Sequence, residues 1–523
     1  MGRAKQISLE WPAGGVSEHG SYHKQWMDGQ LQAPTSVDAL NVRSWDHTTG
    51  RMRGASRPGI SKQVSTQLSG ANDIQHINHV AYSVAEGTSQ SLRSVVAVAV
   101  SQGTVKKFTS SGYTLATGGT SVLSATSVFV DSSEMFGILY FVDGVNAKRW
   151  IASTNTVENW TTTNGSLPVN GVKRPRLICT WRSRIVQAGL EGDEHNWFMS
   201  KAGFPLNWDY APAVSDETDA VAGNNSLAGM SPDSINTLIS YSDDKLIFGC
   251  DHSIWQMTGD PASGGRIDNI SMTTGMAFGR PWCRDPNGVL YFIGSRGGLF
   301  AMTPNQMPVR ISDKTLEKRL ADEIDLSTDK ILLEWDDYSQ HVLIFISPTS
   351  GATTDHYAFD VRNNALWPEK FTTQAHNPIC THTLDGDAAA DRVILLGCQD
   401  GYIRKIDYAA DDDDGVAISS WIMLGPIVQG RGDRFRLDEL RIDLGESSDN
   451  VNYDVFVGNT ADIAESSTAF YSGTWTKTKQ YSERRRASGR AMYLQLINET
   501  LDKKWQFEQA AAVIKSVGPN YRR

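Results

Sequence analysis

A phrase of two short strands recurs seven times along this chain of 523 residues. In a typical copy a short apolar strand leads into a turn with Gly, Asp, Asn or Ser, and a second strand then ends in an aromatic residue or Met. The clearest copies pair 245–249 with 252–257, 289–293 with 297–302, and 392–396 with 401–406. The first strands begin near residues 95, 138, 184, 245, 289, 342 and 392, so successive copies start 43 to 61 residues apart. A strand-based repeat of about 40–50 residues is typical of β-propeller blades.

The repeat therefore predicts an all-β fold, a β-propeller of about six to eight blades. A hairpin with one apolar face cannot bury that face alone, whereas radial stacking of similar sheets buries both faces and leaves only short edges. We interpret the apolar runs as inner strands of the blades. The alternatives are an array of β-sandwiches or a β-helix, and the long spacing argues against the helix. The gap of 61 residues leaves room for an insertion or a degenerate blade.

Three regions follow from the pattern. Residues 1–72 do not fit the repeated pattern, and we predict that they form an irregular or β segment that makes inter-subunit or ring-closure contacts. Residues 73–410 are predicted to form the propeller. The run Asp411 to Asp414 begins the third region, 411–523, and is interpreted as a solvated linker. Apolar residues alternate over 436–444, 453–457 and 492–496, which predicts an additional C-terminal antiparallel β-domain resembling a sandwich.

Composition excludes several classes of protein. No apolar run reaches the ~18 residues of a membrane span, and the start lacks the apolar core of a signal peptide. The five Cys are widely spaced without a Cys-x-x-Cys pair, so we expect reduced thiols without zinc or disulfides, in a chain made in a reducing cytoplasm. The net charge of −10 argues against tight wrapping of nucleic acid.

A search for catalytic chemistry finds none of the common motifs for nucleophiles, zinc or nucleotides. His76 and His79 are three residues apart, which in a strand places them on opposite faces, so they do not predict a shared metal. Asp336 and Asp337 fit a solvated turn between strands. We therefore predict no catalytic, cofactor-binding or metal-binding residues, no cofactor, and a protein that is not an enzyme.

Two clusters of arginine are the remaining candidates. Arg pairs well with carboxylates at interfaces, so these side chains are candidate inter-subunit contacts, with solvated loops as the alternative. The clusters are Arg43, Arg51, Arg53 and Arg57, and Arg484, Arg485, Arg486 and Arg490.

The first cluster lies in a segment that resembles tail proteins of short-tailed bacteriophages. The matching positions are Ala33-Pro34, Asn41-Val42-Arg43, Gly50-Arg51, Arg53-Gly54 and Arg57-Pro58-Gly59. The stretches 182–189, 197–209 and 505–508 fit the same family, and the chain is most similar to the tail nozzle proteins, also called tail tubular protein B. It lacks the Gln-Gln-Pro phrase near the start of the best-known members.

The resemblance implies a structural virion protein, part of the DNA-ejection conduit below the portal and adaptor. It implies a homo-oligomeric ring, expected to be a hexamer, that contacts adaptor or portal proteins and tail fibres or a tail needle. Genomic DNA would pass through without specific binding, and the chain would not enter a membrane. The protein would be located in the virion tail, after its synthesis in the host bacterial cytoplasm. The alternatives are a lectin-like or other β-propeller binding scaffold, and a tail-associated glycan hydrolase with carboxylates at the central channel.

Overall fold

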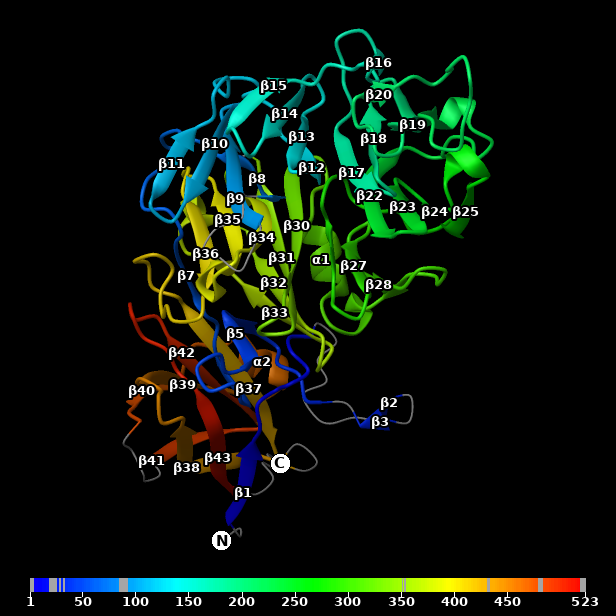
Figure 1. Cartoon of the computed structure of the whole chain (residues 1–523). Helices are drawn as coiled ribbons and strands as arrows, with labels where there is room; N and C mark the ends of the chain where they lie inside the picture. Colours follow the sequence, from blue (N-terminus) through cyan, green and yellow to red (C-terminus); the bar gives the residue numbers. More distant parts are fainter. Residues whose placement is uncertain are drawn as a thin grey trace.

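Seven four-stranded antiparallel sheets are arranged as the blades of a propeller in the part of the chain that the structure describes (Figure 1). The computed structural model describes residues 4–17, 26–27, 30–31, 33–83, 93–349, 351, 354–429, 433–477 and 483–517, without the side chains of 26–27, 30–31, 314, 317 and 485. The predicted all-β propeller of six to eight blades is thus confirmed, with seven blades.

Four strands build each blade, from the central axis outward. The innermost strands are β8 (Ile74–Ser83), β12 (Asp131–Met135), β17 (Leu177–Trp181), β22 (Ile235–Ser242), β26 (Trp282–Arg284), β30 (Asp329–Asp336) and β34 (Pro378–Asp385). The second strands are β9 (Arg93–Ser101), β13 (Ile138–Val142), β18 (Arg184–Leu190), β23 (Lys245–Cys250), β27 (Leu290–Ile293), β31 (His341–Pro348) and β35 (Arg392–Cys398).

The outer half of each blade is shorter. The third strands are β10 (Thr104–Thr109), β14 (Ala147–Ile151), β19 (Asp193–Met199), β24 (Ile254–Thr258), β28 (Leu299–Met302), β32 (His356–Asp360) and β36 (Ile403–Asp407). The outermost strands are β11 (Gly112–Leu115), β15 (Thr156–Asn159), β21 (Val221–Ala222), β25 (Arg266–Ser271), β29 (Val309–Arg310), β33 (Ala365–Glu369) and β7 (Gly59–Lys62).

The recurring phrase corresponds to the second and third strands of the blades. The interpretation of its apolar runs as inner strands is corrected here, because a further strand precedes each run and lies nearer the axis. Second strands are predominantly apolar since a neighbouring blade covers each of their faces: Leu246, Ile247 and Phe248 of β23 are all buried. The 61-residue gap is an insertion in the third blade, where β20 (Asn207–Trp208) pairs with β16 (Asn164–Gly165) ahead of β21.

The ring closes through β7, which comes from the start of the chain. It pairs antiparallel with β36 and completes the last blade, with Ile60 opposite Ile406. Each interface between neighbouring blades has its own buried apolar cluster among the described residues, including one that joins the last blade to the first. That last cluster packs Ile74 and Ile77 of β8 against Leu395 of β35.

Two further sheets form a sandwich beside the propeller (Figure 1). One sheet has the order β1 (Ala4–Leu9), β43 (Phe507–Ser516), β38 (Phe435–Leu444), β41 (Glu483–Gly489). The other has the order β4 (Ala39–Leu40), β37 (Ser420–Val428), β42 (Ala491–Asn498), β39 (Val451–Gly458), β40 (Tyr471–Trp475). The predicted C-terminal antiparallel domain is present, and the first residues of the chain supply two of its strands.

The propeller and the sandwich share one apolar core, which contains Tyr357 and Trp367 of the sixth blade together with Trp505 and Ile514 of the sandwich. A hairpin of β5 (Val42–Trp45) and β6 (Met52–Ser56) adds Val42 to this core. Small elements complete the chain: the helices α1 (Glu317–Glu323) and α2 (Ala461–Glu465) and the pair β2 (Trp26–Met27) and β3 (Gln30–Leu31). Neither described helix has the length and apolar character that crossing a membrane requires.

Candidate functional site

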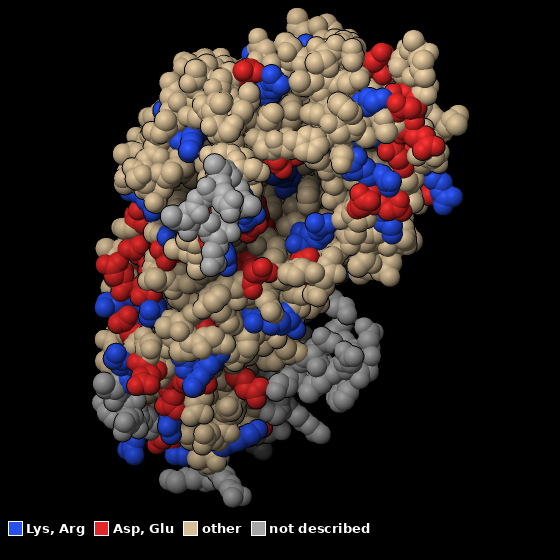
Figure 2. All heavy atoms as spheres, in the orientation of Figure 1, with Lys and Arg blue, Asp and Glu red and all other residues tan. Residues whose placement is uncertain are grey.

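A channel of about 1260 Å³ runs along the propeller axis, and its wall is built mainly from the innermost strands and the loops beside them. Figure 2 shows the molecule hollowed within the propeller, with acidic and basic side chains on the wall. The innermost strands β8, β26, β30 and β34 contribute polar residues to this wall. The channel is a concave site of the kind in which ligands often bind.

Arg280, which lines the channel, forms an ion pair with buried Asp131 and so joins the fifth blade to the second. Arg280 Nη2 lies 3.0 Å from Asp131 Oδ1, and the same nitrogen donates to the carbonyl of Ser132 at 3.2 Å. Asp131 also accepts hydrogen bonds from the backbone of Ser132 and of Ile178. Burial raises the pKa of Asp131, although Arg280 and these N–H groups oppose that effect.

Lys330 and Glu334 lie on β30, four residues apart and thus on one face of the strand. Glu334 accepts hydrogen bonds from the hydroxyls of Thr381 and Thr383 on β34, at 2.9 and 3.0 Å, and burial raises its pKa. Lys330 makes no ion pair or hydrogen bond to any described residue, and burial lowers its pKa to about 8. The sixth blade thus places the unpaired amine of Lys330 in the channel together with the carboxyl groups of Asp329, Glu334, Asp336 and Asp337.

Three histidines lie at the junction of the first blade with its neighbours. His76 Nε2 is 2.6 Å from the hydroxyl of Ser132 on β12, and His79 Nδ1 is 2.7 Å from His382 Nε2 on β34. His76 and His79 therefore contact different blades. Burial lowers the pKa of all three rings, so they are neutral near pH 7.

Three arginines of the first cluster, Arg43, Arg53 and Arg57, pair with carboxylates inside the molecule, which corrects the expectation that they face other subunits. Arg43 pairs with Glu369 through two hydrogen bonds of 2.5 and 3.0 Å, and both partners are largely buried. Arg57 pairs with Asp413 in the same two-bond geometry, at 2.9 and 2.6 Å. The cause is the position of the β5–β6 segment between propeller and sandwich, where its guanidinium groups need carboxylates from both sides.

Arg53 has a similar intramolecular role. It donates to Asp46 at 2.8 and 3.0 Å and to Gln506 at 2.8 Å, and it pairs with Glu508. The aspartates after 410, expected to be a solvated linker, also take part: buried Asp413 holds Arg57, and Asp414 pairs with Arg404. These carboxylates are structural because the chain passes there from the last blade to the sandwich.

The other arginines of the two clusters lie on the surface. Arg51, Arg486 and Arg490 are exposed, and the side chain of Arg484 is 90% exposed, 4.0 Å from Glu439. The side chain of Arg485 lies outside the described residues. As candidate contacts to other subunits, Arg51, Arg484, Arg486 and Arg490 are accessible in this structure.

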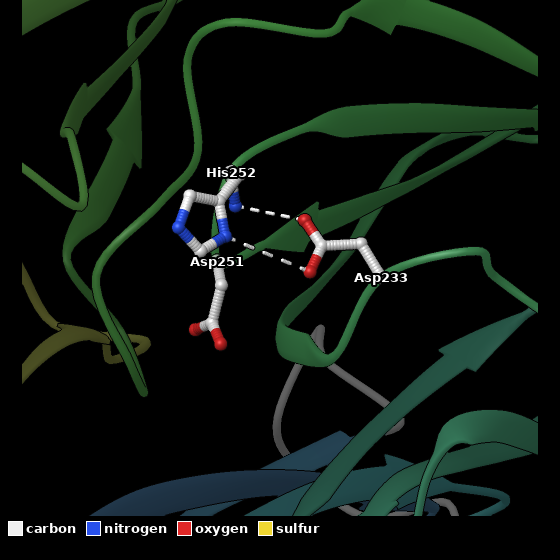
Figure 3. A group of neighbouring side chains, drawn as sticks. All are labelled: Asp233, Asp251 and His252. Atoms are coloured by element: carbon white, nitrogen blue, oxygen red, sulfur yellow. Dashed lines mark hydrogen bonds and ion pairs between the residues drawn. The ribbon is translucent and has the colours of Figure 1, made fainter.

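Asp233, Asp251 and His252 form a group in the fourth blade that the sequence analysis missed (Figure 3). Asp233 accepts hydrogen bonds from the backbone of His252 and the hydroxyl of Ser253, both at 2.8 Å, and Asn236 donates to Asp251. Burial tends to raise the pKa of Asp233, but these hydrogen bonds lower it overall. The carboxylates thus organise the turn before β24, and this local role accounts for the group.

The sequence matches no protein-family model and no curated protein. Solved structures of similar shape include an extracellular domain of a one component system from B. thetaiotaomicron, at 11% identity and a TM-score of 0.42; the match covers 75% of this chain and 45% of that one. Virginiamycin B lyase from Staphylococcus aureus matches at 10% identity and a TM-score of 0.38, over 63% of this chain and 98% of that one. YCF48 bound to D1 peptide matches at 10% identity and a TM-score of 0.37, over 68% of this chain and 99% of that one. This chain thus spans less than half of the first structure, and the likeness concerns the fold.

Proposed function

We propose that this chain is a non-catalytic β-propeller scaffold that binds other macromolecules. The observation that carries the proposal is the segment 200–230, which comprises the insertion of the third blade and the connection that follows β21 and exposes several large apolar side chains. They are Phe204, Val214, Leu227 and Met230, and Leu227 is fully exposed. Exposed apolar residues gathered in one segment are typical of a surface that a partner covers. A closed ring that shares a core with the sandwich is a rigid support for such a surface.

The specific partners that we propose are subunits of a short phage tail, in which the chain would form a nozzle ring that DNA traverses. Support comes from the resemblance carried by residues 41–59. Arg43 and Arg57 within that segment join the two domains, so the resemblance extends to residues that determine how the domains are held together. The net charge of −10 suits a surface that does not retain DNA.

Binding is favoured over glycan hydrolysis by the state of the channel carboxylates. Hydrolysis requires one carboxyl group as acid and a second as nucleophile or base. Asp131 is paired with Arg280 and accepts two backbone hydrogen bonds, while Glu334 accepts from two threonine hydroxyls. Both groups already have stabilising partners in the fold. Of the other carboxylates in the channel wall, Asp336 accepts from the hydroxyls of Ser339 and Tyr408, and Asp143 accepts three backbone hydrogen bonds. We assign none of these four groups a catalytic role.

The test compares Phe204→Asp combined with Leu227→Asp against Leu501→Asp, which changes an exposed apolar residue in the sandwich. We expect the double variant to melt like the wild type and to be lost from assembled tail particles, because charge opposes burial at the interface. Leu501→Asp should incorporate normally. Normal incorporation of the double variant would remove the segment 200–230 as the docking surface, and fully infectious particles without the chain would remove the nozzle proposal.

A further inference from the structure

Two basic side chains of adjacent blades line the channel and have donor nitrogens without a described acceptor. Arg280 uses Nε and Nη2 for Asp131 and Ser132, whereas Nη1 has no partner among the described residues. Lys330 Nζ likewise has none, and both residues belong to the channel wall. The free donors of the two side chains are therefore available to a molecule in the channel.

The two cations act on the same region of the channel. Burial lowers the pKa of His76, and the positive charges of Arg280 and Lys330 lower it further. Burial raises the pKa of Cys380, and the same two charges oppose this increase. Both cations line the same channel as His76 and Cys380, which come from the first and last blades.

No described carboxylate forms an ion pair with Lys330, although Asp143, Asp329, Asp336, Asp337 and Asp385 also line the channel. Asp131 is paired with Arg280, and Glu334 is held by threonine hydroxyls of β34. Burial raises the pKa of Asp73, and the positive charge of Lys330 opposes this increase. Asp73 nevertheless forms no ion pair with Lys330 among the described residues. A cation that is partly removed from water and has no counter-ion costs free energy, and a bound anion would recover that cost.

We propose that the central channel binds a small ligand that carries a carboxylate or phosphate group, with Lys330 and Arg280 Nη1 as the donors to its oxygens. The neutral imidazoles and the Glu334 carboxyl can form hydrogen bonds to hydroxyl groups on the rest of the ligand. A volume of about 1260 Å³ is large enough for a molecule of monosaccharide size or more. This site is separate from the segment 200–230 and is independent of the proposed role in a tail.

The test is calorimetric titration of the isolated full chain with inorganic phosphate, with glucuronate and with neutral glucose. Lys330→Met should weaken binding of the preferred anion about 10–100-fold, as expected for loss of a hydrogen bond to a charged group. Lys330→Arg should stay within a few-fold of the wild type. The matched control is Lys107→Met on β10, a lysine outside the channel wall, which should bind as the wild type does.

Because Lys330 has no partner to lose, Lys330→Met should melt at or above the wild-type temperature and should incorporate into particles normally. Binding of phosphate alone assigns a phosphate ligand, and binding of glucuronate alone assigns a carboxylate. The proposal is overturned if neither anion binds with a Kd of about 10 mM or tighter, or if Lys330→Met binds as well as the wild type.

Discussion

Arg51 and Arg57 lie six positions apart in the same turn-rich segment, yet their surroundings differ completely. Arg57 is buried, and besides Asp413 it donates to Asn41 and to two backbone carbonyls. Arg51 is exposed on the turn before β6. A sequence pattern places both in a polar segment, but only the fold decides which guanidinium has a carboxylate partner.

We predict that Arg57→Ala lowers the free energy of unfolding by about 3–5 kcal/mol, because it leaves Asp413 buried without a counter-charge. Arg51→Ala should change it by less than about 0.5 kcal/mol. Guanidinium chloride denaturation measures the change in the free energy of unfolding of both variants. Adding Asp413→Asn to Arg57→Ala should restore part of the loss; equal stabilities of the two single variants would show that the buried pair contributes little.

His356 makes folding sensitive to moderate acid. Its Nδ1 accepts from the backbone of Ile346 and its Nε2 faces Asn377 Oδ1, both at 3.2 Å, which favours the neutral ring. Burial lowers its pKa to about 4, against about 6.5 when unfolded. The unfolded chain thus binds more protons between these values, so stability is complete above pH 6.5 and decreases as the pH falls toward 4.

We predict that His356→Gln reduces this pH dependence by up to about 1.4 kcal/mol per pH unit. This pH dependence is measured from the denaturant midpoint of unfolding at pH 7.5, 6.5, 5.5 and 4.5. The control is His252→Gln, whose side chain is 72% exposed and which should keep the wild-type dependence. An unchanged slope in His356→Gln would show that other groups, such as buried His47 with its pKa near 4, dominate.

At the scale of elements, β7 completes the last blade under a tight steric constraint. A Cβ atom at Gly59 would lie 1.9 Å from the carbonyl oxygen of Asp412, and the Gly59 N–H donates to the carbonyl of Ala410. The strand therefore fits against the segment 410–412 only without a side chain at this position.

We predict that Gly59→Ala displaces β7 and removes amide hydrogen-exchange protection from β7 and β36. Gly50→Ala is the control: its φ of +71° makes Ala there cost about 1–2 kcal/mol, but no atom lies within 4 Å of the added Cβ. Exchange mass spectrometry of both variants distinguishes local from global destabilisation. If β7 and β36 keep their protection in Gly59→Ala, the segment 410–412 can move to accommodate the methyl group.

The repeat could be predicted from sequence because the second strands are covered on both faces and stay apolar. The innermost strands could not be predicted, since residues such as Gln75, His76 and Glu334 interrupt their apolar pattern where they border the channel. Outermost strands of two residues, such as β21 and β29, leave almost no pattern. The channel site depends on contacts such as His79 with His382, 303 residues apart, which local spacing does not encode.

At the scale of the whole molecule, Trp11 joins the propeller to the sandwich. Its ring centroid lies 5.8 Å from that of Trp367 on β33, 6.0 Å from Trp505 and 5.6 Å from Phe507 on β43. With Arg43 and Arg57 across the same boundary, these contacts make the two domains depend on each other.

We predict one cooperative thermal transition for the full chain, because neither domain can lose this shared core without exposing the other. Trp11→Ala should cost about 3–5 kcal/mol and should weaken hydrogen-exchange protection in β33 and β43 together. Phe470→Ala, at a half-exposed ring in the sandwich, is the control and should have a small effect. Two well-separated calorimetric transitions in the wild type would contradict a shared unit.

The use of the first residues to finish both domains also determines when the protein can fold during synthesis. Ile60 must wait for Ile406, 346 residues later, and β1 must wait for β43 near the end of the chain. At about 5–20 residues per second, the ribosome needs roughly 20–70 seconds to supply the partner of β7. Throughout that time the edge of β7 is unpaired and open to other chains, so nascent polypeptides depend on dilution or chaperones until the partner strands have been synthesised.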